Sequence, residues 1–192
     1  MTVGRGVIQN NRVRDAVAIL LEAIGDDPTR EGLLDTPNRV AEMYAELFSG
    51  VGSDPQDAID TTFESDHGDP VVLRDVPFHS VCEHHLLPFF GRAQIGYIPN
   101  GKIAGLSKLA RTLALACSRL QVQERLTGQV ADSIFKALNP RGVAVELEAE
   151  HLCMSMRGVA IPGNEVVTTA VRGSFDGAPL DAKGLLAIMR RK

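Results

Sequence analysis

The stretch HSVCEHHLLP, residues 79–88, concentrates side chains that bind metals or transfer protons: a cysteine, a glutamate and two histidines occupy the consecutive positions 82–85. The whole chain has three cysteines and five histidines, so this density is unusual. Cys82 and His85 form a Cys-x-x-His pair, a spacing at which a turn can direct both side chains at one ion. A regular strand would send them to opposite faces, so we expect the chain to turn there. His84, at Cys-x-His spacing, remains an alternative ligand.

A second set of candidate residues belongs to the segment VAVELEAEHLCMSM, residues 143–156, which predicts a β-strand. Because successive side chains on a strand alternate between faces, His151 and Cys153 would extend its apolar, inward face, about 7 Å apart. The opposite face then carries an acidic, solvent-facing row, Glu146, Glu148 and Glu150. Such a row explains the glutamates, but it does not explain a histidine and a thiol on the buried side.

Cys153 can complete a set of ligands with Cys82 and His85. Two thiolates and one imidazole leave a tetrahedral position free for water, which is typical of a catalytic zinc site, whereas four protein ligands are typical of a structural one. These ligand types favour Zn²⁺ over Mg²⁺ or Ca²⁺. The alternative is that Cys82 and Cys153 are small buried hydrophobes, or a disulfide pair in an oxidised sample. Cys117 is expected in the core, on the apolar stripe of a predicted helix with Leu106, Leu109 and Leu113.

Composition and charge limit the classes of function. With 192 residues, 44% of them apolar and 23% charged, the chain suits one soluble globular domain with at most a small appendage. A formal net charge of −4 indicates neither a nucleic-acid nor a membrane partner. The N-terminus lacks the apolar region of a signal peptide, and no apolar run reaches the roughly 18 residues of a membrane-spanning helix. An odd number of cysteines argues against a disulfide framework, and we expect a cytoplasmic protein.

Hydrophobic periodicity predicts the elements that must position these side chains. Two helices are expected first, over residues 11–28 and 35–50, the second with Thr36 as its N-cap and Pro37 at its first helical position. A polar linker at residues 54–69 follows. From there the pattern predicts strand, strand, helix, helix, strand, strand and a terminal helix, over residues 71–81, 89–99, 105–121, 121–138, 143–156, 165–175 and 180–192.

Long segments of the sequence resemble GTP cyclohydrolase I: TPNRVAEMYAELFSG, HSVCEHHLLPFFGRAQIGYIPNGKIAGLSKLARTLALACSRLQVQERLT, GVAVELEAEHLCMSMRG and TTAVRGSF. Such enzymes convert GTP and water to 7,8-dihydroneopterin triphosphate and formate, the first step toward folate or tetrahydrobiopterin. The resemblance implies an α+β tunnelling fold (T-fold) with an antiparallel sheet and two central helices, preceded by N-terminal helices. It also implies a toroidal homodecamer, a dimer of pentamers, with active sites at subunit interfaces. We expect an N-terminal helical region and linker, residues 1–65, and a T-fold catalytic domain, residues 66–192.

By match to the family motifs, the zinc ligands are Cys82, His85 and Cys153, which leaves His84 for catalysis. The reaction hydrolyses the imidazole ring of guanine at C8, a demanding site for neutral water, and zinc lowers the pKa of bound water to about 7. A positioned acid must protonate N7, and His151 suits that role because its ordinary pKa is near 6.5. His84 is expected to assist in proton shuttling, or else to orient a ligand.

The remaining site residues follow from the same match. Ser107 and Gln123 resemble residues that hold or relay protons at the ribose. Glu124 matches the carboxylate that accepts hydrogen bonds from N1–H and the 2-amino group of guanine; without the resemblance it reads as a solvated helix charge. The anionic triphosphate needs a local cluster of cations, and the matches are Lys108, Arg111, Arg157 and Arg39. Of these, Arg39 is the one expected from a neighbouring subunit, because its helix lies outside the core fold.

Two other classes of function remain open from the sequence. A non-catalytic, zinc-stapled interaction module would use His84 or His151 as a fourth ligand. A related tunnelling-fold enzyme acting on another purine or pterin would use Cys82 or Cys153 as a nucleophile and would need no metal. Turnover of substrate excludes the first class, and loss of activity on chelation excludes the second.

Overall fold

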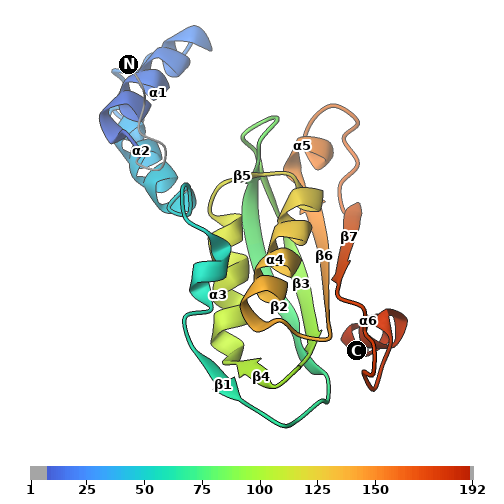
Figure 1. Ribbon diagram of the computed structural model, residues 1–192. Coiled ribbons are helices and arrows are strands. Elements are labelled where there is room, and N and C mark those ends of the chain that lie inside the picture. The colour runs from blue at the N-terminus through green and yellow to red at the C-terminus, as the bar shows by residue number, and fades with distance from the viewer. Residues whose placement is uncertain (1–7, 191–192) are drawn as a thin grey trace.

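The computed structural model describes residues 8–190 and shows a twisted sheet with helices packed against it and a pair of N-terminal helices projecting from the body (Figure 1). Five strands form the main sheet in the order β5-β2-β3-β6-β7. Neighbouring strands run antiparallel except for β5, which pairs parallel with the end of β2. Their bounds are β2 Val71–Cys82, β3 Pro88–Ile98, β5 Leu120–Gln121, β6 Gly142–His151 and β7 Glu165–Arg172.

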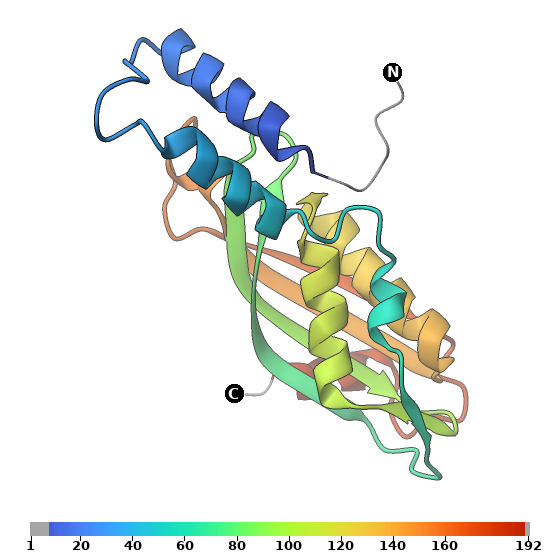
Figure 2. The same ribbon diagram turned by 90° about the vertical axis from the view of Figure 1, so that its left-hand side faces the viewer.

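The helices and short strands complete an α+β fold. They are α1 Asn10–Ala23, α2 Thr36–Leu47, the 3₁₀ turn η1 Pro55–Ala58, β1 Thr62–Glu64, β4 Lys102–Ala104, α3 Leu106–Cys117, α4 Gln123–Leu138, α5 Leu152–Ser155 and α6 Ala182–Met189. Strands β1 and β4 pair in a small second sheet. Helices α3 and α4 cover one face of the main sheet, and α6 lies on the other (Figure 2). The α+β class and the predicted strand-strand-helix-helix-strand-strand order are confirmed.

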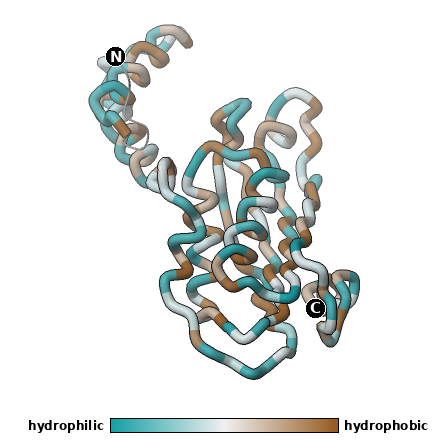
Figure 3. Tube along the Cα trace, viewed as in Figure 1, coloured by the Kyte–Doolittle hydropathy of each residue, from teal (hydrophilic) through white to brown (hydrophobic). Residues whose placement is uncertain are grey.

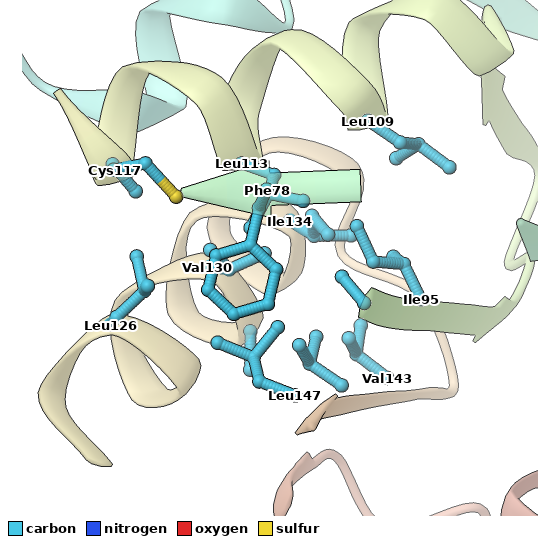
Figure 4. Close-up of a cluster of buried hydrophobic side chains, with 14 of the residues drawn as sticks. Phe78, Ile95, Leu109, Leu113, Cys117, Leu126, Val130, Ile134, Val143 and Leu147 are labelled. Carbon is cyan, nitrogen blue, oxygen red and sulfur yellow. The ribbon is translucent and has the colours of Figure 1, made fainter. Parts of the chain in front are cut away.

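The main core fills the space between the sheet and helices α3 and α4 (Figure 4). On α3, Leu109, Leu113 and Cys117 recur every four residues, so they share the face that meets the sheet, and all three are buried. Leu106 was predicted on the same stripe but is 54% exposed, because it occupies the first helical position, one turn before the face that packs. Buried partners from the sheet and α4 include Phe78, Ile95, Val130, Ile134, Val143 and Leu147.

Helix α6 packs on the opposite face of the sheet through Leu185 and Met189. This cover corrects the prediction that the three glutamates of β6 form one solvated row, because Glu146 is only 7% exposed. Its carboxylate accepts hydrogen bonds from the Arg190 guanidinium at 2.9 Å and the Thr169 hydroxyl at 3.0 Å. The bond from Arg190 holds the pKa of Glu146 below its ordinary value, although burial opposes the shift.

Strands β3 and β6 approach each other closely at Gly91. A Cβ atom on this residue would lie 1.8 Å from the carbonyl oxygen of Glu148 and 2.7 Å from the Cα atom of Ala149. No side chain fits there, so the close contact between strands requires glycine. Two residues along the same pair of strands, Phe89 lies opposite His151.

The N-terminal helices α1 and α2 pack on each other away from the sheet, and both carry apolar as well as polar segments (Figure 3). Helix α1 buries none of its residues, and Ile19, Leu20 and Ile24 are all more than half exposed. Helix α2 begins at Thr36, so its N-cap is Asp35, one residue before the predicted cap. Large apolar side chains exposed together on a helix are typical of a surface that another molecule covers.

The predicted polar linker at residues 54–69 is partly regular, since it contains η1 and β1 and places Ile59 in the main core. The predicted division of the chain between residues 65 and 66 stays a prediction. Residues 1–7, used in the signal-peptide argument, and 191–192, the end of the predicted terminal helix, lie outside the described part. Within residues 8–190, no helix has the length and apolar character that crossing a bilayer demands.

Candidate metal centre and active site

Cys82 is the last residue of β2, and His85 lies on the tight turn that follows. The Cys82 amide donates to the Leu87 carbonyl at 2.8 Å, and the Leu86 amide donates to the Cys82 carbonyl at 2.9 Å. Leu86 has a φ of 55°, a left-handed conformation that is typical of such reversals. The predicted turn is therefore confirmed, and it brings the thiol and the imidazole to the same side of the chain.

Cys153 reaches the same place from helix α5. One ligand atom each from Cys82, His85 and Cys153 lies within 4.8 Å of the other two, and the two sulfur atoms are 4.0 Å apart. Two thiols and an imidazole at this spacing could hold a metal ion. Among residues 8–190 no other set of histidine, cysteine and acidic side chains gathers in this way.

The location of Cys153 corrects the strand predicted over residues 143–156. Strand β6 ends at His151, and Cys153 lies in the helical turn α5, where the Met156 amide donates to the Leu152 carbonyl at 3.1 Å. His151 and Cys153 therefore do not share a strand face. A short apolar run such as LCMSM does not distinguish a strand from a helical turn, which is why the pattern misled. Both residues nevertheless lie at the same end of the sheet.

Electrostatics at the candidate metal centre oppose an unpaired thiolate. Burial raises the pKa of Cys153, and the neighbouring Cys82 thiol raises it further, whereas the charge of Arg157 lowers it. The thiolate is the form that binds metals, and a cation would supply the missing positive charge. Arg157 also contacts His85, one of the three candidate ligands: its Nη1 atom lies 3.1 Å from His85 Nε2. The donor set and its surroundings thus fit a divalent metal ion.

His151 stands beside this group at the end of β6, partly buried. Its imidazole stacks on the ring of Phe89, with centroids 4.6 Å apart. Burial lowers the pKa of His151, while the negative charge of Glu124 opposes that shift. Its Nε2 atom lies 2.7 Å from Oε1 of Gln123, at the start of α4. His151 is therefore partly buried and lies two residues before Cys153, at the same end of the sheet as the candidate metal centre.

His84 and Glu124 lie at the rim of the same region. The Nδ1 atom of His84 is 3.8 Å from the sulfur of Cys82, and its side chain is 63% exposed. Glu124 occupies the first turn of α4, where its carboxylate faces solvent and acts on the charge of His151. Both side chains are free to meet a ligand, and neither is buried among apolar residues.

Ser107, Lys108 and Arg111 lie elsewhere in the chain, at the start of α3. The end of α3 is the part near the candidate metal centre, because the Cys117 carbonyl accepts a bond from Ser80 at 2.7 Å. Ten residues of helix separate Ser107 from Cys117, a length of about 15 Å. Lys108 forms an ion pair with Asp60 there, and the bond from Lys108, helped by the charge of Arg111, lowers the pKa of Asp60.

The candidate residues thus form two groups within one chain. The group at the metal centre comprises Cys82, His84, His85, Cys153, His151, Gln123, Glu124 and Arg157. The second group comprises Ser107, Lys108 and Arg111. Arg39 joins neither in the chain itself: it is exposed on α2 and pairs with Asp35 at 3.0 Å.

Sequence reasoning missed the side chains that support His151. These are Phe89, whose ring lies against the imidazole, and Thr168 and Thr127, which are hydrogen-bonded behind Gln123. Phenylalanine and threonine are ordinary strand and helix residues, so their types gave no signal. Only the register that pairs Phe89 with His151 would have identified the first of them.

The fold and the site together define a class: an α+β protein with a candidate metal centre of two thiols and one imidazole beside a partly buried histidine. A family model described as GTP cyclohydrolase I matches residues 13–190, and the chain belongs to this family. The resemblance seen in the sequence is thereby confirmed.

Three relatives called GTP cyclohydrolase 1 illustrate the similarity. The protein of Brevibacillus brevis is 50% identical over 181 residues, covering 94% of this chain and 97% of its own length. That of Bacillus cytotoxicus is 53% identical over 182 residues, with coverages of 94% and 96%. That of Geobacillus kaustophilus is 56% identical over 166 residues, with coverages of 86% and 88%. The similarity therefore spans nearly the whole chain, including both groups of candidate residues.

Proposed function

We propose that this chain is a zinc-dependent hydrolase that converts GTP and water to 7,8-dihydroneopterin triphosphate and formate. The observation that carries the proposal is the convergence of Cys82, His85 and Cys153 beside His151, in a chain of the GTP cyclohydrolase I family. Relatives bearing that name match it along nearly their full length. The product makes this the first step of folate or tetrahydrobiopterin biosynthesis.

Cys82, His85 and Cys153 would hold the zinc ion. Three protein ligands leave a tetrahedral position open, as in catalytic zinc sites. When bound, zinc supplies the Lewis acidity that lets water act as a nucleophile at neutral pH. The tight turn after β2 and the short helix α5 fix the two sulfur atoms 4.0 Å apart, so little rearrangement of the chain is needed to bind the ion.

His151 would deliver the proton that N7 of guanine requires when C8 is attacked. Its ring is fixed by Phe89 and Gln123, which supports a role that depends on orientation. His84, exposed next to Cys82, would shuttle protons at the same centre. Glu124 would accept hydrogen bonds from N1–H and the 2-amino group of guanine, two adjacent donors that adenine lacks, and so select the base.

The triphosphate would be bound by Arg157, Lys108, Arg111 and Arg39, and Ser107 would act at the ribose. Arg157 already lies at the metal centre, 3.1 Å from His85. Lys108 lies about 14 Å and Arg111 about 9 Å along α3 from Cys117, at the helix end that reaches this centre. We infer that they serve the metal centre of another subunit, which would place each active site between copies of the chain.

Two features of the chain support a toroidal homodecamer built as a dimer of pentamers. Among the described residues, β7 pairs only with β6, and β2 is paired on its outer side only at Val81 and Cys82. Unpaired strand edges at both ends of one sheet allow head-to-tail pairing of copies, which closes into a ring. An apolar cleft of about 710 Å³ between α1 and α2, bordered by Leu86, offers a further contact surface.

The three cysteines of the chain are all free thiols, which supports our proposal of a cytoplasmic location, where thiols stay reduced. The proposed activity is tested by incubating the purified protein with GTP, measuring formate and the absorbance of a pteridine, and analysing the metal in the same sample. We expect both products and close to one zinc ion per chain. Zinc without turnover would indicate a structural site, and turnover that survives exhaustive chelation would contradict the metal-dependent mechanism.

A further inference from the structure

The side-chain amide of Gln123 has its orientation fixed by its partners. Its Nε2 atom lies 3.0 Å from the carbonyl oxygen of Leu147, 2.8 Å from that of Val166 and 3.1 Å from the Thr168 hydroxyl. Carbonyl oxygens only accept hydrogen bonds, so the amide nitrogen must face them. The amide oxygen consequently faces Nε2 of His151 at 2.7 Å, where it can only accept.

Two threonine hydroxyls extend this order behind the amide. The Thr127 hydroxyl donates its proton to the main-chain carbonyl of Gln123 at 2.7 Å. Its proton is then used, so in the 2.6 Å contact between the two hydroxyls Thr168 must donate to Thr127. Thr168 is left with a lone pair that faces the Gln123 amide, whose two N–H protons serve three acceptors, with one proton shared between two of them. Each of these hydrogen bonds therefore has a fixed donor and a fixed acceptor, and exchanging the two roles in any one of them would break a hydrogen bond.

We propose that Gln123 is a positioning residue for His151: it holds the neutral imidazole in the tautomer protonated on Nε2, so that Nδ1 is the ring nitrogen that takes up the proton released by the attacking water and delivers it to N7 of the substrate. Gln123 is 1% exposed, so no water competes for its amide. The Phe89 ring lies parallel to the imidazole, with 1° between the planes, and fixes its rotation. The second half of the inference rests on the proposed function, whereas the tautomer is a property of the chain alone.

This role differs from a contact with the ribose, which the family resemblance implies for Gln123. The amide nitrogen is already engaged by three acceptors within the protein. A side chain held in this way acts through the group that it orients. Neutral imidazole has one donor and one acceptor nitrogen, so fixing the donor also fixes the acceptor.

The tautomer can be read directly in the wild-type assembly by magic-angle-spinning NMR of protein labelled with ¹⁵N-histidine, at a pH where the rings are neutral. The chain has five histidines, and the His151→Asn variant identifies the signals of His151 by their loss. We expect a proton on Nε2 and none on Nδ1. A ring protonated on Nδ1 would overturn the proposal. This measurement needs no turnover, so failure of the proposed function would leave its outcome intact.

Gln123→Met tests the consequence for catalysis, with Gln121→Met as its matched control. Gln121 is also buried and donates to the Ala116 carbonyl and to Gln129, but among the described residues its side chain forms no hydrogen bond with His151. For Gln123→Met we expect kcat to fall by roughly 10²-fold, with KM for GTP within about threefold, because the general acid loses its orientation. Its His151 signals should show a mixture of tautomers.

In Gln121→Met the His151 signals should match the wild type. Equal losses of kcat in the two variants would assign the effect to the fold and would contradict a positioning role, as would an unchanged kcat in Gln123→Met. Both variants are compared only when their sedimentation matches that of the wild type. If Gln123→Met does not assemble, the wild-type tautomer alone decides the proposal.

Discussion

The imidazole of His151 lies parallel to the phenyl ring of Phe89, with 4.6 Å between the ring centroids. Phe89 is fully buried and His151 only partly, so the phenyl ring forms a rigid wall behind the histidine. Stacked rings of this kind contribute about 0.5–1.5 kcal/mol beyond the area that they bury. The stack leaves the imidazole free to exchange protons in its own plane while it prevents rotation out of that plane.

Replacing Phe89 with leucine should therefore lower kcat by more than the accompanying loss of stability alone would explain. We expect Phe89→Leu to lose about 1–2 kcal/mol of stability and to lower kcat about tenfold or more, because the imidazole can tilt. The control is Phe78→Leu, since Phe78 is also buried and touches the edge of Phe89 but not His151. Steady-state kinetics and thermal unfolding measure both effects. Matching kcat values for the two variants would show that the stack does not serve catalysis.

Cys153→Ser should lose zinc and activity together. A serine hydroxyl is a far weaker zinc ligand than a thiolate, and two protein ligands do not hold the ion. Cys117→Ser is the matched control: burial raises the pKa of Cys117 to about 12, and this thiol is buried in the core without belonging to the group of three candidate ligands. We expect the control to keep its zinc in atomic-absorption measurements. A full metal content in Cys153→Ser would remove Cys153 from the ligand set.

Mixing two inactive variants should restore activity if active sites lie between subunits. Lys108→Ala damages the start of α3, and Cys153→Ser damages the metal group. In randomly mixed assemblies, a shared site receives intact parts from both neighbours in roughly one quarter of cases. We expect co-expressed chains to approach that fraction of wild-type activity. A site contained within one chain would stay inactive.

The control for this experiment pairs Lys108→Ala with Arg111→Ala. Both residues lie at the start of the same helix, so no mixture places an intact pair in one site. We expect no recovery from that pairing. Recovery there equal to that of the first pair would mean that the two variants were not fully inactive, and the comparison would then argue against shared sites.

The ion pair between Glu146 and Arg190 should make stability depend on pH in the acid range. Because Arg190 lowers the folded-state pKa of Glu146, the carboxylate stabilises the fold above its ordinary pKa of 4.5, and this contribution is lost as the pH falls through the lower folded-state value. Arg190→Met should lower the thermal unfolding temperature at pH 7 by a few degrees, which corresponds to a loss of about 1–3 kcal/mol in the free energy of unfolding.

At pH 3 we expect the difference between Arg190→Met and the wild type to shrink, because protonated Glu146 no longer needs the cation. Lys183→Met is the control, since Lys183 is exposed on the same helix and forms no ion pair among the described residues. Thermal scans at the two pH values provide the comparison. A difference that stays constant between them would mean that Arg190 stabilises α6 by packing alone.

Periodicity was sufficient for the large elements, because each buries one regular face. Leu109 and Leu113 on α3, and the inward-facing Val143, Val145, Leu147 and Ala149 on β6, are buried as predicted. The exceptions occur where an element ends or another element covers it. Leu106 begins a helix, Cys153 follows a strand end, and neither position is determined by a repeating pattern.

The grouping of Cys82, His85 and Cys153 was predictable from the sequence, whereas the side chains that surround His151 were less so. The Cys-x-x-His spacing anticipates the turn between Cys82 and His85, which local chain geometry controls. The burial of Glu146 depends on α6, a helix from the C-terminal end of the described chain. The stack of Phe89 on His151 depends on the register of β3 and β6. Such contacts join residues far apart in sequence, so no local pattern encodes them.

The narrow gap at Gly91 has a consequence for the histidine two positions away. Any methyl group introduced there would act as a wedge, because backbone atoms of Glu148 and Ala149 already occupy its space. A side chain there would push β3 away from β6 and would separate Phe89 from His151, the pair of residues two positions along the same strands. The spacing of β3 and β6 at this end of the sheet thus depends on a residue that has no side chain.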